Sequence, residues 1–312
     1  MNPENTTANI SVVMATYNGE RFLKQQIDSI LNQSLPPTEL IVIDDCSQDG
    51  SLRILQEYAS KNPIVKFFSN EVNIGFVKNF EKGISLSSGN LIALSDQDDI
   101  WVVDKLQKLF EGIGDSLLIY SNSELVDESG KSLHKKMSDI KNQIGFNSSL
   151  MFVIGTWAPG HAFLFKRTLA EKCIPFPSIV AHDFWLAFMA TCYKPVKYLA
   201  EPLVLYRQHS SNTVSANTFS KNKNKREISR AEKEEMSRER MQFLYKSCPA
   251  ERIEEKLVYK KISESYLNNS FGNRVLRFNT FFKYRDLILA YKNKSYFGRI
   301  LFCVKMFFKI DA

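Results

Sequence analysis

Short apolar runs alternate with longer stretches of helical spacing in the N-terminal part of the chain. The runs are bounded by turn-forming residues, which predicts buried strands at 10–14, 40–43, 65–68 and 91–94. Between the runs, apolar residues recur every three or four positions, as at Leu23, Ile27 and Ile30, which predicts helices. This alternation predicts an α/β fold with a parallel sheet and right-handed crossovers.

A second group of elements is expected after Trp101. The pattern predicts a helix at 104–111, strands at 117–121, 124–126, 162–165 and 196–199, and an extended segment at 201–209. Residues 134–149 are polar and weakly patterned, which indicates a mobile loop or lid. Later helical patterns cover 230–246, 250–268 and 296–310. We therefore expect an α/β domain at 1–212 and a basic, mainly helical region at 213–312.

Charge is divided unevenly between these two regions. Residues 1–212 hold 19 Lys and Arg against 23 Asp and Glu, a net charge of −4. Residues 213–312 hold 22 against 11, a net charge of +11. Such a basic region indicates an anionic partner, either a nucleic acid or a membrane surface. No nucleic-acid-binding module is recognisable, so we expect no nucleic acid partner.

The last apolar stretch, 296–310, repeats its apolar residues at helical spacing and adds Arg299, Lys305 and Lys309. It is too short to span a bilayer. We favour an interfacial helix that lies on anionic lipid. The alternative is a helix that packs on the first domain.

Cysteine usage and the N-terminus both indicate the cytoplasm. The five cysteines are scattered without CxxC spacing, which argues against a zinc site and against a disulfide scaffold. Residues 1–9 are polar and lack the apolar core of a signal peptide. We therefore expect a protein that works in a reducing compartment.

Acidic residues gather where two predicted strands end. Asp96, Asp98 and Asp99 follow the fourth strand, and Asp44 and Asp45 follow the second. Because parallel strands end at one edge of a sheet, both clusters are expected there. Crowded carboxylates favour a cation, and Mg²⁺ or Mn²⁺ commonly bridges carboxylates to phosphates. The alternative is a polar turn that caps a helix. Neither GxGxxG nor GxxxxGK[ST] is present, which disfavours dinucleotide dehydrogenases and P-loop NTPases.

Six blocks of sequence occur in a recognisable order: SVVMATYNGERFLKQQIDSILNQS, LIVIDDCSQDGS, NIGFVKNFEKGI, SSGNLIALSDQDDIW, HDFW and LVLYRQH. Together they resemble family-two glycosyltransferases of the GT-A fold, over roughly residues 8–212. SDQDDIW and HDFWLA are most similar to the bacterial rhamnosyltransferase-like branch, which builds surface polysaccharide. The resemblance implies a Rossmann-like, mixed, mainly parallel sheet flanked by helices.

The resemblance also implies a donor site at the strand ends. Thr16 and Tyr17 would line the pocket of the nucleotide base, and Asp44 would hydrogen-bond that base. Asp96 would contact the ribose or its neighbourhood. Lys78 stands where the family often has an arginine near the phosphates. By residue type alone, Tyr17 could equally pack in the core, and Lys78 could be an ordinary solvated lysine.

A metal site and a catalytic base follow from the same resemblance. Asp98, the second acid of the DxD, would ligate the metal that bridges the diphosphate, with Asp99 in support. His209 would contact the metal or the diphosphate, with Arg207 beside it in the nucleotide-sugar site. Asp183 would be the general base. Without the resemblance, Asp183 would be read as an N-cap and His209 as a surface or core histidine.

The chemistry of these residue types agrees with the implied roles. Transfer from a nucleotide-sugar needs a carboxylate to take the acceptor's proton, and positive charge to neutralise the departing diphosphate. We therefore expect an inverting glycosyltransferase that uses Mn²⁺ or Mg²⁺ and a dTDP- or UDP-linked sugar, with rhamnose a candidate. The expected acceptor is a surface glycan such as O-antigen or capsule, or a lipid-linked oligosaccharide, at the inner face of the cell membrane. The alternatives are an inactive glycan- or lipid-associated scaffold of the same fold and a nucleotidyltransferase.

Overall fold

The computed structural model describes residues 8–209 and 229–309, which form two compact units. The sheet unit comprises the described residues of 1–145 and 157–216, and the helical unit those of 146–156 and 217–312. The expected division at residue 212 takes no account of the segment 146–156. That segment belongs with the C-terminal helices, although in sequence it interrupts the sheet unit.

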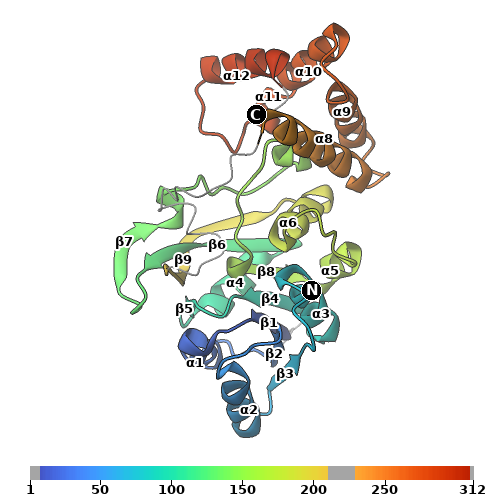
Figure 1. Ribbon diagram of the computed structural model, residues 1–312. Helices are drawn as coiled ribbons and strands as arrows, with labels where there is room; N and C mark the ends of the chain where they lie inside the picture. Colours follow the sequence, from blue (N-terminus) through green and yellow to red (C-terminus); the bar gives the residue numbers. More distant parts are fainter. Residues whose placement is uncertain (1–7, 210–228, 310–312) are drawn as a thin grey trace, which may run out of the picture. The chain divides into compact units, whose positions relative to one another are not determined.

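A mixed sheet is the centre of the sheet unit (Figure 1). Within the described residues it has nine strands: β1 (Ile10–Thr16), β2 (Glu39–Asp44), β3 (Val65–Ser69), β4 (Leu91–Ser95), β5 (Ile100–Trp101), β6 (Leu118–Val126), β7 (Ser132–Lys136), β8 (Phe163–Lys166) and β9 (Lys197–Arg207). Their order is β3-β2-β1-β4-β8-β6-β9-β5, with β7 paired to β6. The strands β1 to β4 are parallel, and β8 is antiparallel to β4 and β6. The predicted mixed, mainly parallel sheet is confirmed.

Helices join the parallel strands in the order that the hydrophobic spacing predicts. They are α1 (Glu20–Leu31), α2 (Ser51–Lys61) and α3 (Phe76–Leu86), followed later by α4 (Lys105–Ile113), α5 (Arg167–Cys173) and α6 (His182–Tyr193). Helix α3 approaches the sheet closely at Gly83, where a Cβ would lie 2.4 Å from Cγ1 of Val13. Only glycine leaves room for this approach. The helix–sheet contacts set the positions of the loops that follow β1, β2 and β4.

Strand β6 is longer than the pattern predicts because its middle is polar but buried. Strands were expected at 117–121 and 124–126, but they form one continuous strand. Ser121, Asn122 and Ser123 are at most 1% exposed. The Asn122 amide is satisfied, because Nδ2 donates to Oγ of Ser138 at 2.8 Å and Oδ1 accepts from the N–H of Ser123 at 2.9 Å. Hydropathy alone does not reveal such a buried polar stretch.

The stretch that was expected to be a loop or lid begins with regular structure. Strand β7 pairs antiparallel with β6, with Lys136 opposite Glu124. A 3₁₀ turn at Met137–Asp139 follows, and the side chain of Met137 is buried. Most β7 side chains are exposed and polar, which is why the apolar pattern does not predict this edge strand.

The helical unit is built from α8 (Arg230–Ser247), α9 (Ile253–Ser265), α10 (Phe271–Lys283), α11 (Arg285–Ile288) and α12 (Tyr296–Phe308). The segment 146–156 completes its core. Phe146 and Phe152 are fully buried, with ring centroids 5.3 Å apart. The carbonyl of Phe152 accepts a hydrogen bond from Nη2 of Arg240 in α8 at 2.7 Å. The hydroxyl of Tyr259 in α9 donates to a carbonyl of the same segment.

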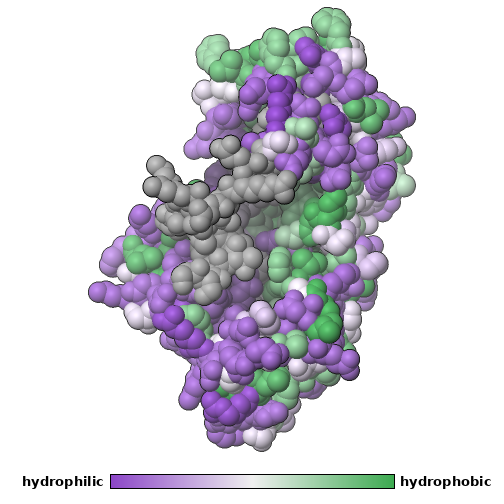
Figure 2. Space-filling model, in the orientation of Figure 1, coloured by the Kyte–Doolittle hydropathy of each residue, from purple (hydrophilic) through white to green (hydrophobic). Residues whose placement is uncertain are grey.

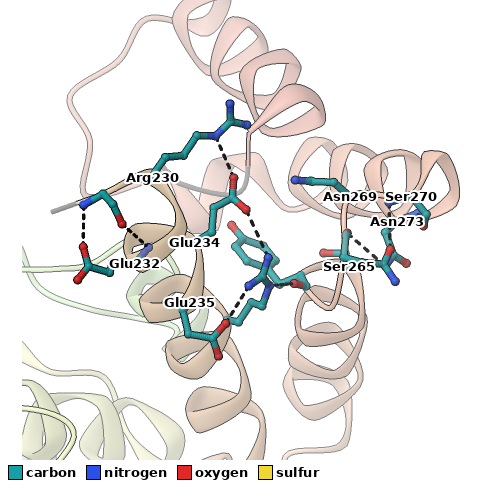
Figure 3. A network of polar contacts seen from close by, with 12 residues as sticks. Arg230, Glu232, Glu234, Glu235, Ser265, Asn269, Ser270 and Asn273 are labelled. Carbon is teal, nitrogen blue, oxygen red and sulfur yellow. Dashed lines mark hydrogen bonds and ion pairs between the residues drawn. The ribbon is translucent and has the colours of Figure 1, made fainter.

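Charged contacts join α8 to the end of α9 (Figure 3). Arg238 contacts Glu234 at 3.3 Å and Glu235 at 2.8 Å on its own helix. Its Nε also donates to the carbonyl of Tyr266 at 3.1 Å. Exposed ion pairs within a helix contribute little to stability. The hydrogen bond to Tyr266 matters more here, because it ties the two helices together.

Candidate active site

Gln97 joins the acidic loop after β4 to the loop after β1. Its Oε1 accepts hydrogen bonds from Oγ1 of Thr16 at 2.6 Å and from the N–H of Tyr17 at 2.8 Å. Its Nε2 donates to the carbonyl of Tyr17 at 3.1 Å. Gly19 packs against the same side chain, since a Cβ there would lie 2.5 Å from Oε1. Two loops that were predicted to share one edge of the sheet are therefore joined directly.

Asp44 and Asp45, at the end of β2, have different surroundings. Asp44 is fully buried, and its Oδ2 accepts from the N–H of Ser47 and the Oγ of Ser69, both at 3.1 Å. Its Oδ1 has no hydrogen-bond partner among the described residues. Asp45 instead accepts from backbone N–H groups in the loop before α3, including that of Gly75 at 2.9 Å. The Asp45 carboxylate thus stabilises the loop before α3, whereas Oδ1 of Asp44 can still accept a hydrogen bond from another group.

Asp96, Asp99 and His161 form a compact cluster of potential metal ligands. One ligand atom from each lies within 4.8 Å of the others. Nδ1 of His161 is 3.8 Å from an Oδ2 of each acid. The imidazole is held from its other sides, because Nε2 lies 2.9 Å from Oγ of Ser123 and the ring stacks on Tyr206 with centroids 4.7 Å apart.

The pKa values of the two acids of this cluster shift in opposite directions. Burial raises the pKa of Asp99 to about 8, against the charge of His161 and with the help of Asp98 and Asp96. Burial would also raise the pKa of Asp96, but the interaction with His161 outweighs it and lowers that pKa. Oδ2 of Asp99 has no hydrogen-bond partner among the described residues. The cluster therefore has room for more positive charge.

Lys105 supports the cluster from α4. It is fully buried, its Nζ donates to the carbonyl of His161 at 2.6 Å, and Nζ lies 3.4 Å from the centroid of the Trp101 ring. Burial lowers the pKa of Lys105 well below its ordinary value, although Asp99 and Asp96 oppose the shift. Lys105 therefore fixes the backbone that carries the imidazole.

Asp98 and His209 are in direct contact in the structure. Nε2 of His209 lies 2.7 Å from Oδ2 of Asp98, and both side chains are largely buried. The imidazole also lies beside the ring of Phe22, with centroids 5.0 Å apart. A carboxylate oxygen and an imidazole nitrogen are both ligands that Mn²⁺ accepts.

Arg207 contacts the acidic loop from within the protein. Its side chain is 1% exposed. Nε donates to the carbonyl of Asp98 at 2.7 Å, Nη1 to the carbonyl of Glu128 at 2.6 Å and Nη2 to Oε1 of Gln25 at 2.7 Å. Its backbone N–H donates to Oδ1 of Asp99 at 3.2 Å. The guanidinium lies over the ring of Phe22, with Cζ 4.6 Å from the ring centroid, and its donors are engaged with protein acceptors.

Asp183 lies in the first turn of α6 without capping it. The N-cap is Ala181, and Oδ1 of Asp183 accepts from the N–H of Phe184 at 2.6 Å. The alternative in which Asp183 serves as the N-cap is therefore wrong. The described residues form no hydrogen bond to the second carboxylate oxygen of Asp183.

The start of α6 lies against the segment that carries the cluster histidine. His182 is buried, and its ring stacks on Phe80 with centroids 4.2 Å apart. At Gly160 a Cβ would lie 2.6 Å from Nε2 of His182 and 3.4 Å from Cβ of Asp183. Because His161 directly follows Gly160, the start of α6 lies next to the segment that carries the cluster histidine.

Comparison with known proteins identifies the family. Residues 11–172, just over half of the chain, match the family described as Glycosyl transferase family 2. The chain belongs to glycosyltransferase family 2. The predicted family, fold class and enzyme class are thereby confirmed.

Relatives of this glycosyltransferase come from several bacteria. An uncharacterized glycosyltransferase of Haemophilus influenzae is 31% identical over 222 residues, which cover 69% of this chain and 82% of that protein. The dTDP-rhamnosyl transferase RfbG of Shigella flexneri is 28% identical over 228 residues, covering 68% and 77%. The crystal structure of S. aureus TarS 1-349 in complex with UDP-GlcNAc is 19% identical, covers 97% of this chain and 82% of that chain, and superposes with a TM-score of 0.60.

One predicted donor residue of this glycosyltransferase has other partners in the structure. Nζ of Lys78 contacts Oε2 of Glu81 at 2.8 Å and donates to the carbonyl of Phe176 at 3.1 Å. Its side chain is 43% exposed. Lys78 thus lies on α3 as an ion-paired surface residue.

Sequence reasoning did not identify every residue that shapes this site. No role is predicted for Gln97 or Lys105, and a loop histidine such as His161 is as easily without a role as part of an acceptor site. Gln97 stands inside the DxD, so its place between two acids was a usable signal. Lys105 and His161 come from separate elements that meet only in the folded chain, and no spacing in the sequence links them.

Proposed function

We propose that this protein is an inverting, metal-dependent glycosyltransferase that moves a sugar from a nucleotide-diphosphate donor to a hydroxyl of a surface polysaccharide acceptor. The observation that carries the proposal is that one segment contacts both parts of the proposed site: His161 lies beside Asp96 and Asp99, and Gly160 lies beside Asp183 at the start of α6. A site with clustered acids on one side and a separate carboxylate on the other fits transfer from a phosphorylated donor. Two carboxyls flanking a glycosidic bond would fit hydrolysis instead.

The donor is held by the loops after β1 and β2. Asp44 accepts an N–H of the base with its free Oδ1, and Thr16 and Tyr17 line the same pocket. Asp96 contacts the ribose. Lys78 contacts the phosphates after releasing Glu81. We propose dTDP-rhamnose as the first donor to test, by analogy with the Shigella flexneri relative, and UDP-linked sugars second, by analogy with the TarS complex.

A divalent cation, Mn²⁺ or Mg²⁺, fits the residues present. Asp98 and His209 offer an oxygen and a nitrogen ligand, and Asp96 and Asp99 add carboxylates nearby. The Oδ2 of Asp99, which forms no hydrogen bond with the described residues, supports a cation at this loop. When bound, the cation supplies charge neutralisation for the departing nucleoside diphosphate. Arg207 acts as a positioning residue that holds the backbone of this loop, in place of the direct donor contact first expected.

Asp183 removes the proton of the acceptor hydroxyl. Among the residues that the structure describes, only Oδ1 of Asp183 accepts a backbone hydrogen bond, so the other carboxylate oxygen can accept the proton. Direct attack by the activated hydroxyl on the anomeric carbon inverts the configuration there. Such general-base catalysis typically contributes about 10²–10⁴ in rate.

The acceptor is a growing surface glycan, either O-antigen, capsule or a lipid-linked oligosaccharide, at the cytoplasmic face of the cell membrane. The name of a Bacillus subtilis relative, a putative teichuronic acid biosynthesis glycosyltransferase, supports the polysaccharide class. The basic C-terminal region supports an acceptor held at an anionic surface.

The test is a screen of nucleotide-sugars with purified protein, in which released nucleoside diphosphate is measured with Mn²⁺, with Mg²⁺ and with a chelator. We expect metal-dependent release from one donor class, and loss of release in Asp98→Ala. Full activity of Asp98→Ala would overturn the metal assignment. Release of pyrophosphate would instead indicate a nucleotidyltransferase. Absence of both turnover and calorimetric binding of nucleoside diphosphate with Mn²⁺ would indicate an inactive scaffold.

A further inference from the structure

Helix α12 presents apolar side chains on two opposite faces. Its inner face packs in the helical unit, where Cys303 and Met306 are fully buried. Its outer face carries Phe297, Leu301, Val304 and Phe308, which are 79%, 70%, 38% and 60% exposed. Their spacing of four, three and four residues places them on one side of the helix. A helix of a soluble protein ordinarily turns a polar face outward, so this outer face needs an explanation.

The start of α10 extends this apolar surface. Phe271 is 75% exposed, and its ring meets that of Phe307 edge to face, with centroids 6.1 Å apart. We call Phe271, Phe297, Leu301, Val304 and Phe308 the aromatic face. In Figure 2, green side chains gather over α10 and α12 at the top of the picture. Large contiguous apolar surfaces of this kind mark interaction sites.

The aromatic face is held rigidly by the helices behind it. Arg277 of α10 is fully buried, and its Nε donates to the carbonyl of Met306 in α12 at 2.5 Å. Its Nη1 donates to the carbonyl of Ser265 at the end of α9 at 2.6 Å. One guanidinium therefore joins three helices, and the exposed phenylalanines belong to a packed structure.

The surroundings of the aromatic face are strongly basic. Residues 269–309 contain nine Lys and Arg and one acid, Asp286, which gives a net charge of 9 − 1 = +8. That acid is already paired, because Asp286 contacts Nη1 of Arg299 at 2.8 Å. Lys305 and Lys309 are exposed beside the apolar residues of α12. An apolar face bordered by cations matches the chemistry of an anionic lipid surface.

We propose that the aromatic face lies in the headgroup region of an anionic bilayer, with Phe271, Phe297, Leu301 and Phe308 inserted and the lysines on the lipid phosphates. Within 8–209 and 229–309, no helix is long and apolar enough to cross a bilayer, so α12 would lie along the surface. A second copy of the chain fits this face less well, because residues 269–309 of each copy carry a net charge of +8 and the two regions would repel each other. The inference rests on the proposed function only for its purpose, which is to bring the enzyme to a membrane-held acceptor.

The first test removes the apolar contact. The full chain is floated with phosphatidylcholine vesicles that contain or lack phosphatidylglycerol. We expect binding to the anionic vesicles only. In the double variant Phe297→Ser/Leu301→Ser, we expect binding to be weaker by a factor of about ten or more. The matched control is Ile253→Ser/Leu257→Ser on α9, whose side chains are 67% and 53% exposed. The control should bind like the unchanged protein.

The second test removes the charge. Lys305→Glu/Lys309→Glu should weaken binding to anionic vesicles and reduce its sensitivity to salt, because screening weakens charge attraction at a surface. Lys260→Glu/Lys261→Glu on α9 is the control, since both lysines are exposed outside the aromatic face. Equal losses in this pair would show a non-specific effect of net charge and overturn the proposal.

Other outcomes distinguish a lipid surface from a second copy of the chain as the partner of the aromatic face. Failure of the unchanged protein to float, or equal binding of the α12 variant and its α9 control, overturns the lipid assignment. A dimer in sedimentation that is lost in Phe297→Ser/Leu301→Ser would assign the face to a second copy. Release of nucleoside diphosphate is measured on the same protein preparations in the absence of vesicles. Turnover without flotation refutes only the lipid surface, and flotation without turnover refutes only the proposed function.

Discussion

Replacing Arg207 by methionine tests whether this buried cation positions the acidic loop. Methionine keeps an apolar stem but removes the three side-chain donors to Asp98, Glu128 and Gln25. Each charge-assisted hydrogen bond contributes about 1.5–3 kcal/mol, and such losses are not additive. Removing one partner from a buried charged network typically costs about 3–5 kcal/mol, so we expect the free energy of unfolding to fall by that amount. Urea denaturation of the metal-free protein measures it.

Arg21→Met is the matched control. Arg21 also lies over the ring of Phe22, at 4.8 Å, and pairs with Glu128 at 2.5 Å, but its side chain is 64% exposed. An exposed pair of this kind contributes at most about 1 kcal/mol, so the control should stay close to the unchanged protein. If Arg207→Met kept full stability and only raised the KM for the donor, Arg207 would contact the donor directly and the positioning role would be refuted.

Three further predictions concern stability and catalysis. Although burial would raise the pKa of Glu39, its contacts with Lys66 and nearby serines hold it at about 2 against 4.5. The stability this provides is present above pH 4.5 and lost as pH falls toward 2, so Glu39→Gln should cost about 3 kcal/mol at neutral pH and flatten acid unfolding followed by circular dichroism. Asp183→Asn should lower kcat by about 10²–10⁴ at unchanged donor affinity in calorimetry; unchanged kcat would remove it as the base. Gly160→Ala places a Cβ 2.6 Å from Nε2 of His182, so kcat should fall while urea unfolding shifts by no more than about 3 kcal/mol; an unaltered kcat would separate α6 from the site.

The first four strands could be predicted because each is a short apolar run that ends in a turn. The same method divided β6 in two, since Ser121, Asn122 and Ser123 are polar and yet buried. It also missed β5, whose two residues form a strand only by pairing with β9. Local hydropathy reports which side chains avoid water, and it carries no information about polar groups that find partners in the core.

The acidic half of the site could be predicted for a related reason. Strand ends define an edge, so Asp44 and Asp98 could be assigned to it from sequence position. The supporting residues could not, because Lys105 reaches His161 across 56 positions and Arg207 reaches Asp98 across 109. Such contacts depend on how helices and strands pack, which no local pattern encodes.

The placement of 146–156 inside the helical unit affects how the protein is made and how it can be recombined. These residues leave the ribosome well before α8 to α12. The side chains of Phe146 and Phe152 therefore stay exposed to solvent until the C-terminal helices have been synthesised. A chimera that exchanged only the C-terminal helices between two relatives would pack the helices of one protein against the 146–156 segment of the other. A functional chimera must therefore exchange the segment 146–156 together with the C-terminal helices.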